Sequence, residues 1–275
     1  MKKHTAFRSA PWVFALPASI GVFVILGPLA GLAFHIPWKD TAQLLSHPDA
    51  LAATRLSVLT ALISTAVCGV LGLPLSLIFT QVLDRTRWKK LSMVLYAFLY
   101  TPVILSPVVS GLALTFFWGR RGLIGQWLNE VGVSIPFTPF AVVLTQIFVG
   151  LPFFVATAVT TLRTIPREFE ELAYVEGATP WEITRKVLLP LSYPGLATAF
   201  LLAFARALGE YGATVTFAGN IAEKTRTIPL NIELMLSSNF MPEALGSSLM
   251  LISLYLIILG LALLLIALQR LRGAR

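Results

Sequence analysis

The sequence contains few charged residues. Asp, Glu, Lys and Arg make up only 12% of its 275 residues, whereas soluble domains carry about 25%. Hydrophobic residues make up 56% of the chain, and the mean hydropathy is +0.80. These values exclude an ordinary soluble protein and indicate that lipid surrounds most of the surface.

Residues that usually carry chemistry are also scarce. Cys68 is the only cysteine, which excludes an internal disulfide, and His4, His35 and His47 lack the spacing of metal ligands. The chain has no G-x-x-x-x-G-K-[ST] phosphate loop and no His/Asp/Glu cluster on one helix face. We therefore expect a protein that is not an enzyme, with no catalytic residue, no metal site and no cofactor of its own.

Long apolar stretches dominate the chain. A membrane helix needs roughly 20 apolar residues, and six stretches qualify: 11–34, 56–80, 91–118, 139–162, 195–218 and 246–268. The pattern predicts an all-α membrane protein with six transmembrane helices in a single domain, 1–275. Pro102 and Pro107 should break the third stretch into a leading piece and a spanning piece. The basic start of the chain also describes a signal peptide, but the first run is longer than a usual signal core and we interpret it as an uncleaved span.

The basic residues are unevenly distributed. The net charge of +8 would suggest nucleic acid as the partner of a soluble protein, but here Lys and Arg lie in short clusters between apolar runs. Fourteen fall at the two termini and in the loops after the second and fourth stretches, against six in the other loops. The positive-inside rule predicts that both termini and residues 163–190 face the cytoplasm of a bacterial-type plasma (inner) membrane.

Charged residues, which are rare in most of the chain, are concentrated in residues 163–190. Pro166 and Gly177 fit the start and the glycine-capped end of a short helix. The tetrapeptide Thr179-Pro180-Trp181-Glu182 predicts a capping box that opens a second helix. This second helix should run to about Leu188 and stop before Pro190, and its predicted apolar face consists of Trp181, Ile183, Val187 and Leu188.

A loop between two spans needs only a few residues, so a folded charged unit suggests a docking surface for a soluble partner. The alternative is a helix pair lying on lipid headgroups. Such helices are usually rich in Lys and Arg, whereas this unit has five acids against four bases. The composition favours docking.

The segment resembles the cytoplasmic "EAA" loop of ABC-importer permeases, which reads E-A-A, three residues, G, nine residues, I-x-L-P. Here Glu171-Leu172-Ala173 is followed at the same spacing by Gly177 and by Val187-Leu188-Leu189-Pro190, with departures at Leu172 and Val187. The resemblance implies a coupling helix that sits in a groove of a separate ATPase subunit, which would use the ATP. The residues implied in coupling are Glu171, Ala173, Gly177, Ala178, Pro180 and Trp181.

The fifth stretch contains two charges. Arg206 and Glu210 are spaced i, i+4, so they share a helix face and can pair. Charges within a membrane span are functional hypotheses, and both a structural pair and a direct substrate contact stay open. Gly209, Gly212 and Gly219 suit either a gate or close helix packing. The predicted translocation pathway comprises Arg206, Glu210, Tyr211, Thr214, Thr216 and Asn220.

This stretch, "ALGEYGATVTFAGN", is similar to permeases of the molybdate/tungstate and sulfate branch. Its residues resemble those of molybdate permeases most. "LSPVVSGLAL" extends the resemblance, and "KTRTIPLNIE" is also similar to one of the two sulfate permease subunits. The resemblance implies a six-helix type-I importer fold. It also implies a second permease copy, ATPase subunits, an external substrate-binding protein and surrounding membrane lipid, with no nucleic acid.

Alternatives to a molybdate permease remain at this point. Within the class they are a sulfate/thiosulfate permease and, further off, a permease for a polyamine, thiamine or an iron complex. An ion-driven secondary transporter would often show internal repeats and midplane carboxylates, but the sequence shows no repeat and only Glu210 in that role. The sequence leaves open molybdate, tungstate or sulfate, and homodimer or heterodimer.

Overall fold

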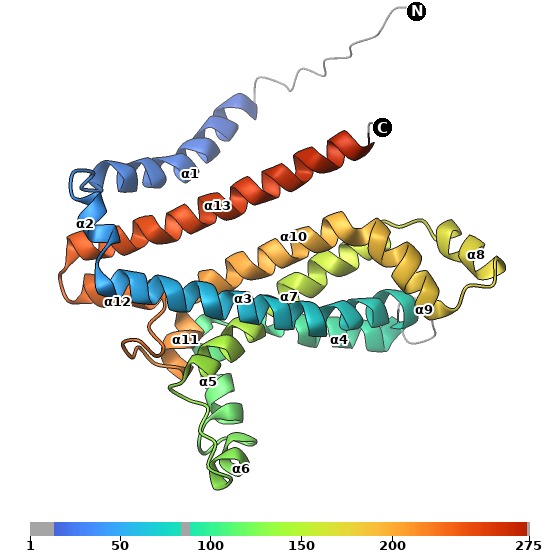
Figure 1. The fold of residues 1–275 in the computed structure, drawn as a ribbon, viewed down its shortest axis with the longest axis horizontal. Coiled ribbons are helices and arrows are strands. Elements are labelled where there is room, and N and C mark those ends of the chain that lie inside the picture. The colour runs from blue at the N-terminus through green and yellow to red at the C-terminus, as the bar shows by residue number, and fades with distance from the viewer. Residues whose placement is uncertain (1–13, 84–88, 274–275) are drawn as a thin grey trace, which may run out of the picture. The chain divides into compact units, whose positions relative to one another are not determined.

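The computed structural model describes residues 14–83 and 89–273, and the regular elements in these residues are all helices (Figure 1). Five of them are long and apolar enough to cross a membrane, or six if one bent pair counts as a single span. The predicted all-α membrane protein is confirmed. The chain divides into two compact units, residues 1–43 and 44–275.

In the first unit, α1 (Ala15–His35) matches the predicted first span, with Pro28 inside it. None of its side chains is buried. The indole N–H of Trp38 donates to the carbonyl of Ala33 at 3.0 Å, which satisfies an acceptor in the last turn of α1. The short helix α2 (Thr41–Leu45) begins at the end of this unit.

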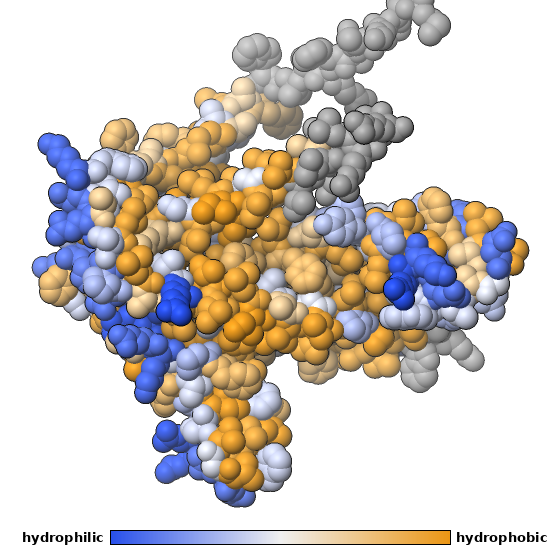
Figure 2. Space-filling view, in the orientation of Figure 1, coloured by the Kyte–Doolittle hydropathy of each residue, from blue (hydrophilic) through white to orange (hydrophobic). Residues whose placement is uncertain are grey.

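The centre of the second unit is formed by α3 (Pro48–Leu77), α7 (Pro139–Arg163) and α10 (Leu189–Leu208), which pack against one another. Small residues let these helices approach closely. A Cβ atom at Gly72 would lie 2.5 Å from the ring of Phe154, and one at Gly69 would lie 2.4 Å from the ring of Phe200. Figure 2 shows that the middle of this bundle is apolar on its surface, while hydrophilic side chains gather at both ends, around α12 and around α8 and α9.

Prolines divide the third stretch, as predicted, but not at both positions. The axes of α4 (Lys89–Ile104) and α5 (Pro107–Trp118) differ by 113°. Pro107 begins α5, whereas Pro102 lies inside α4. The 12 residues of α5 rise about 18 Å, so α5 is too short to cross a hydrocarbon core of about 30 Å by itself.

The prediction that a helix stops before Pro190 is wrong. From α9 (Pro180–Ile183) the chain continues through the π-helical segment η3 (Thr184–Leu188) into α10 without leaving the helix. In the wide turn the N–H of Leu189 donates to the carbonyl of Thr184, five residues back. Pro190 has no N–H to donate, and the helical run continues past it directly after this widened turn.

The fifth stretch is not one helix either. After α10 ends at Leu208, three residues separate it from the short α11 (Gly212–Phe217). We call residues 209–211 the α10–α11 break. α11 packs closely on α5, because a Cβ atom at Gly111 would lie 2.5 Å from Cβ of Thr216.

The remaining helices are short, with one exception. They are η2 (Ile78–Leu83, π-helical, continuing α3), α6 (Gly125–Glu130), α8 (Glu168–Val175), α12 (Ile228–Ser237) and the long α13 (Met241–Gly273). The last matches the predicted sixth span. The sequence did not predict α12, whose first N–H group, that of Ile228, donates to Oγ of Ser57 in α3 at 2.8 Å.

Candidate functional site: the coupling segment and the α10–α11 break

The coupling segment, residues 163–190, begins with α8. Glu168, Glu170 and Glu171 lie in its first turn, where negative charge complements the helix dipole. Its other end is closed as predicted, because Gly177 adopts φ +85°. The N–H groups of Gly177 and Ala178 donate to the carbonyls of Tyr174 and Ala173, each at 3.0 Å. This pair of bonds is a Schellman cap, which requires a left-handed residue that glycine supplies without strain.

The predicted capping box is confirmed. Oγ1 of Thr179 accepts from the N–H of Glu182 at 3.3 Å, and Oε2 of Glu182 accepts from the N–H of Thr179 at 3.1 Å. Lys186 adds an ion pair to Oε1 of Glu182 at 2.8 Å. The N–H groups of Thr179 and Glu182 are therefore both satisfied, and the turn between α8 and α9 is fixed from both sides.

The segment's apolar residues divide into an inner and an outer set. Ile183 and Leu188 are buried with Leu162, and Ala173 and Ala178 pack against them. Trp181 is instead 68% exposed. The prediction of one apolar face that includes Trp181 is thus wrong, because Trp181 lies on the outer surface of α9.

The six residues predicted for coupling therefore occupy different positions. Ala173 and Ala178 face the interior of the segment, and Gly177 forms its turn. Gly177 is exposed, and so are Glu171, Pro180 and Trp181. Three further apolar side chains of α8, which are not among the predicted coupling residues, are more than 60% exposed, namely Leu172, Tyr174 and Val175. Such a group of exposed apolar side chains with charged neighbours is typical of an interaction surface.

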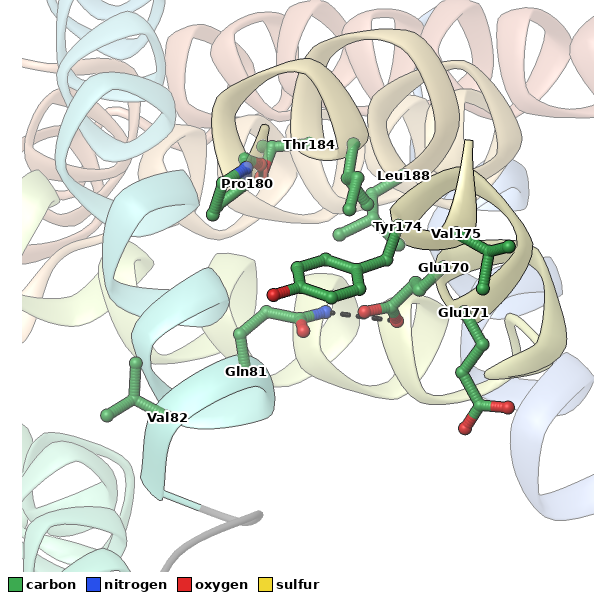
Figure 3. A pocket seen from close by; sticks show the side chains of 10 residues that line it. Gln81, Val82, Glu170, Glu171, Tyr174, Val175, Pro180, Thr184 and Leu188 are labelled. Carbon is green, nitrogen blue, oxygen red and sulfur yellow. Dashed lines mark hydrogen bonds between the residues drawn. The ribbon is translucent and has the colours of Figure 1, made fainter. Parts of the chain in front are cut away.

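A pocket of about 610 Å³ lies between η2, α8 and the start of the α9–η3 run (Figure 3). Gln81 reaches across from η2, and its Nε2 donates to Oε1 of Glu170 at 3.4 Å. Tyr174 and Glu171 line the same pocket. No local sequence pattern pointed to Gln81, because it lies 89 positions from Glu170 and only the fold brings the two together.

At the α10–α11 break, Glu210 is 2% exposed and accepts two bonds. Its Oε2 pairs with Nη1 of Arg206 at 2.7 Å, and its Oε1 accepts from the N–H of Ala213 at 2.9 Å. Arg206 is 30% exposed in its side chain and lies 6.0 Å from the centre of the Phe153 ring. Glu210 thus neutralises the cation and also caps the first turn of α11.

Two side chains from other helices complete the end of α10. The hydroxyl of Tyr255 in α13 donates to the carbonyl of Ala205 at 3.3 Å, and Nε2 of Gln146 in α7 donates to the carbonyl of Ala207 at 3.2 Å. Sequence reasoning missed both residues, since a lone Tyr and a lone Gln in apolar stretches carry no motif. They hold the break to the helix bundle.

The other four predicted pathway residues differ in their burial and in their hydrogen-bond partners. Thr214 is fully buried, and the hydroxyl of Thr216 donates to the carbonyl of Gly212 at 2.9 Å. The amide of Asn220 donates to the carbonyl of Leu230 and accepts from Nε of Arg226. Tyr211 is 37% exposed. Their role in translocation remains a prediction.

We expect Arg206→Met to destabilise the protein more than the double change Arg206→Met with Glu210→Gln. The single change leaves a buried carboxylate without its counter-ion, which costs about 2 kcal/mol here, less than for a fully buried pair because Arg206 is partly exposed. Glutamine removes that charge and keeps an oxygen for the N–H of Ala213. Thermal unfolding of the three purified proteins measures the difference. Equal unfolding temperatures for the single and double variants would contradict it.

Comparisons with known proteins agree with these features. Residues 72–274 match the family described as binding-protein-dependent transport system inner membrane component. The molybdenum transport system permease protein ModB of Mycobacterium tuberculosis is 43% identical over 223 residues, which cover 81% of this chain and 82% of that protein. The sulfate transport system permease protein CysT of Escherichia coli is 31% identical over 224 residues, which cover 80% of this chain and 79% of that protein.

A solved structure shows the same fold. A chain in the crystal structure of a bacterial alginate ABC transporter, in complex with an alginate pentasaccharide-bound periplasmic protein, aligns with a TM-score of 0.67 and 17% sequence identity, over 91% of each chain. The predicted type-I importer permease fold is confirmed. The chain belongs to the family of inner membrane components of binding-protein-dependent transport systems.

Proposed function

We propose that this chain is the transmembrane permease subunit of an ATP-driven importer for a tetrahedral oxyanion, and that the oxyanion is molybdate or tungstate. The observation that carries the substrate is the identity of 43% with a molybdenum permease over 81% of the chain, against 31% with a sulfate permease over 80%. The second candidate is sulfate, because molybdate and sulfate are both tetrahedral dianions and the sulfate permease aligns over nearly the same length.

In this proposal, different subunits carry out ATP hydrolysis, translocation and delivery of the oxyanion. ATP is bound and hydrolysed by a separate ATPase subunit, and this chain has no cofactor and no catalytic residue. A second copy of the permease completes the pathway, and an external substrate-binding protein delivers the oxyanion. The family description, which names binding-protein-dependent transport, supports the last partner.

The coupling segment is the proposed docking surface for the ATPase subunit. Trp181 is 68% exposed on a helix whose start is fixed by the capping box. A large aromatic side chain held on a rigid element loses little freedom when it enters a groove, so it is a good anchor. Glu171 and Pro180 are exposed on the same segment. Ala173 and Ala178 support the surface from within, and Gly177 forms the exposed turn between α8 and α9.

The proposed orientation places the α8–α9 end in the cytoplasm, together with both termini. The coupling segment contains four basic residues, namely Arg163, Arg167, Arg185 and Lys186. By the positive-inside rule, they support a cytoplasmic position for this segment. The basic residues at 1–13, 84–88 and 274–275 lie outside the described residues. The proposed location is a bacterial-type plasma (inner) membrane.

Cysteine labelling tests the orientation. In a Cys68→Ser background, Lys224→Cys should react with an impermeant thiol reagent added to intact cells, because it lies in the proposed external loop. Arg185→Cys should react only after the membrane is permeabilised. Labelling of Arg185→Cys in intact cells would show that the orientation is the opposite of the proposed one.

Trp181→Ala should weaken assembly with the ATPase subunit by roughly thirtyfold, which corresponds to a hot-spot loss of about 2 kcal/mol. Because Trp181 is exposed, the unfolding temperature of the isolated permease should stay unchanged. Trp127→Ala is the matched control, since Trp127 in α6 is 64% exposed but lies outside the coupling segment. Co-purification and a titration of ATPase subunit onto the permease in nanodiscs measure both variants. If Trp181→Ala assembles normally, or if Trp127→Ala loses the same affinity, the docking surface is wrongly assigned.

Deletion of the gene for this chain from its host tests which oxyanion is transported. Molybdate accumulation should fall at low external molybdate, and a large excess of sulfate should compete poorly for uptake in the undeleted strain. Cellular molybdenum and growth on sulfate as the sulfur source are the two measurements. Normal molybdenum content together with a new requirement for reduced sulfur would assign the chain to sulfate transport.

A further inference from the structure

An apolar groove with a volume of about 750 Å³ lies between α3 and α7, and α5 borders one end of it. We call it the α3–α7 groove. Its lining on α3 runs from Leu56 to Leu71, which is about 22 Å along the helix. One leaflet supplies half of a hydrocarbon core of about 30 Å, so the groove is longer than one leaflet is deep. The end at Leu56 and Trp118 is the end of the second unit opposite α8 and α9 (Figure 1).

The groove is open to its surroundings and offers them almost no polar group. Leu59 and Phe140, which line it, are 53% and 56% exposed. Thr60 supplies the one hydroxyl of the described lining, and that hydroxyl already donates to the carbonyl of Leu56 at 2.8 Å. Within a membrane, such a surface is covered either by lipid or by another helix.

The side chains of the groove favour lipid over a helix. Membrane helices pack closely where small residues let their backbones approach, and Gly69 and Gly72 do this inside the bundle. Among the described residues that line the groove, none is Gly, Ala or Ser. Branched side chains such as Ile63 and Val67 would keep another helix at a distance, whereas a flexible acyl chain can follow the space between them.

Positive charge gathers at one end of the groove. Arg55 lies on α3 where the groove begins, and Arg120 and Arg121 follow Trp118 closely in the chain. All three arginines are exposed, and in residues 14–83 and 89–273 no ion pair involves them. Arg120 donates only its Nε–H within this part of the chain, to Oγ of Ser134 at 3.0 Å. Tryptophan is favourable at the level of lipid headgroups, so Trp118 marks the depth at which a headgroup would lie.

Arginines near the ends of membrane helices also reach the headgroup region without binding any particular lipid. That role needs no groove beside them. Here three cations without counter-ions stand at the end of an apolar groove, and this combination matches the two parts of an anionic phospholipid. A phosphate would accept charge-assisted hydrogen bonds from the guanidinium groups, while the acyl chain would lie along α3 and α7.

We propose that the α3–α7 groove is a lipid site, in which an anionic phospholipid lays one acyl chain along the groove and pairs its phosphate with Arg55, Arg120 and Arg121. The inference depends on neither the transported oxyanion nor the ATPase subunit. It can therefore fail while the proposed function stands.

The first test compares the lipids that the full-length chain retains. The protein is extracted from nanodiscs with equal amounts of phosphatidylglycerol and phosphatidylcholine, and native mass spectrometry counts the bound lipids. Wild type should retain phosphatidylglycerol preferentially. Arg55→Gln with Arg121→Gln should lower that preference by roughly tenfold, because two phosphate contacts are lost. Lys90→Gln with Lys224→Gln is the matched control, since it removes the same charge from two exposed positions outside the groove.

The second test fills the groove. Ile63 is 45% exposed in the middle of the α3 wall, so Ile63→Trp should occupy the space of the acyl chain and prevent retention of either lipid. Leu256→Trp is its control, because Leu256 in α13 is 62% exposed and lies outside the groove. It should retain phosphatidylglycerol as wild type does. Free glycerophosphoglycerol, which is the headgroup without acyl chains, should not displace the lipid. Unfolding temperatures show whether each variant is intact.

Equal retention of the two lipids by wild type would overturn the inference. Full retention by Ile63→Trp, an unchanged preference in the double arginine variant, or an equal loss in the controls would also overturn it. Displacement by glycerophosphoglycerol would do so too, because the arginines would then bind a phosphate without the groove. The other possible occupant is a second copy of this chain. A photo-crosslinker on Ile63→Cys, in the Cys68→Ser background, that captures a second copy while wild type retains no lipid would assign the groove to that copy.

Discussion

Every backbone N–H and carbonyl within a membrane must find a partner inside the protein, because lipid offers none. The α10–α11 break shows how this constraint shapes the molecule. Ending α10 at Leu208 exposes carbonyls, and Tyr255 and Gln146 donate to two of them. Starting α11 at Gly212 exposes N–H groups, and Glu210 accepts from one. Arg206 then balances the charge that this cap introduces. One interruption of a helix therefore ties together α7, α10, α11 and α13.

The same constraint explains why Pro190 does not end a helix. A proline in a regular helix leaves a carbonyl unpaired and collides with it. In η3 the chain widens by one residue per turn instead, and the helical run continues from Pro180 to Leu208. An interruption at Pro190 would have separated the coupling segment from the bundle at the membrane surface. The π-helical turn keeps the two continuous.

Local signals were enough to predict much of the structure. The apolar stretches gave the membrane helices, and the capping box and Gly177 gave the turn between α8 and α9, because each depends on neighbours within a few residues. Features that depend on distant contacts were not predictable. The sequence "TIPLNIELML" is too short to be predicted as a span, but it forms α12, in which Asn231 bonds to Ser247 and the first N–H bonds to Ser57. Gln146 and Gln81 were missed for the same reason.

Continuity between the two candidate sites follows from these corrections. The run from Pro180 to Leu208 has 29 residues, which correspond to about 44 Å of helix. Trp181 lies at one end of it and the α10–α11 break at the other. Because a hydrogen-bonded helix resists stretching, the proposed docking of an ATPase subunit at Trp181 would carry a displacement along the run to Arg206, beside the break. The place where such a displacement would be absorbed is the break, where the regular helix ends and side chains of Tyr255, Gln146 and Glu210 supply part of the hydrogen bonds. Two of the predicted coupling residues, Pro180 and Trp181, therefore lie at one end of a continuous helical run, and Arg206 of the predicted pathway lies near its other end.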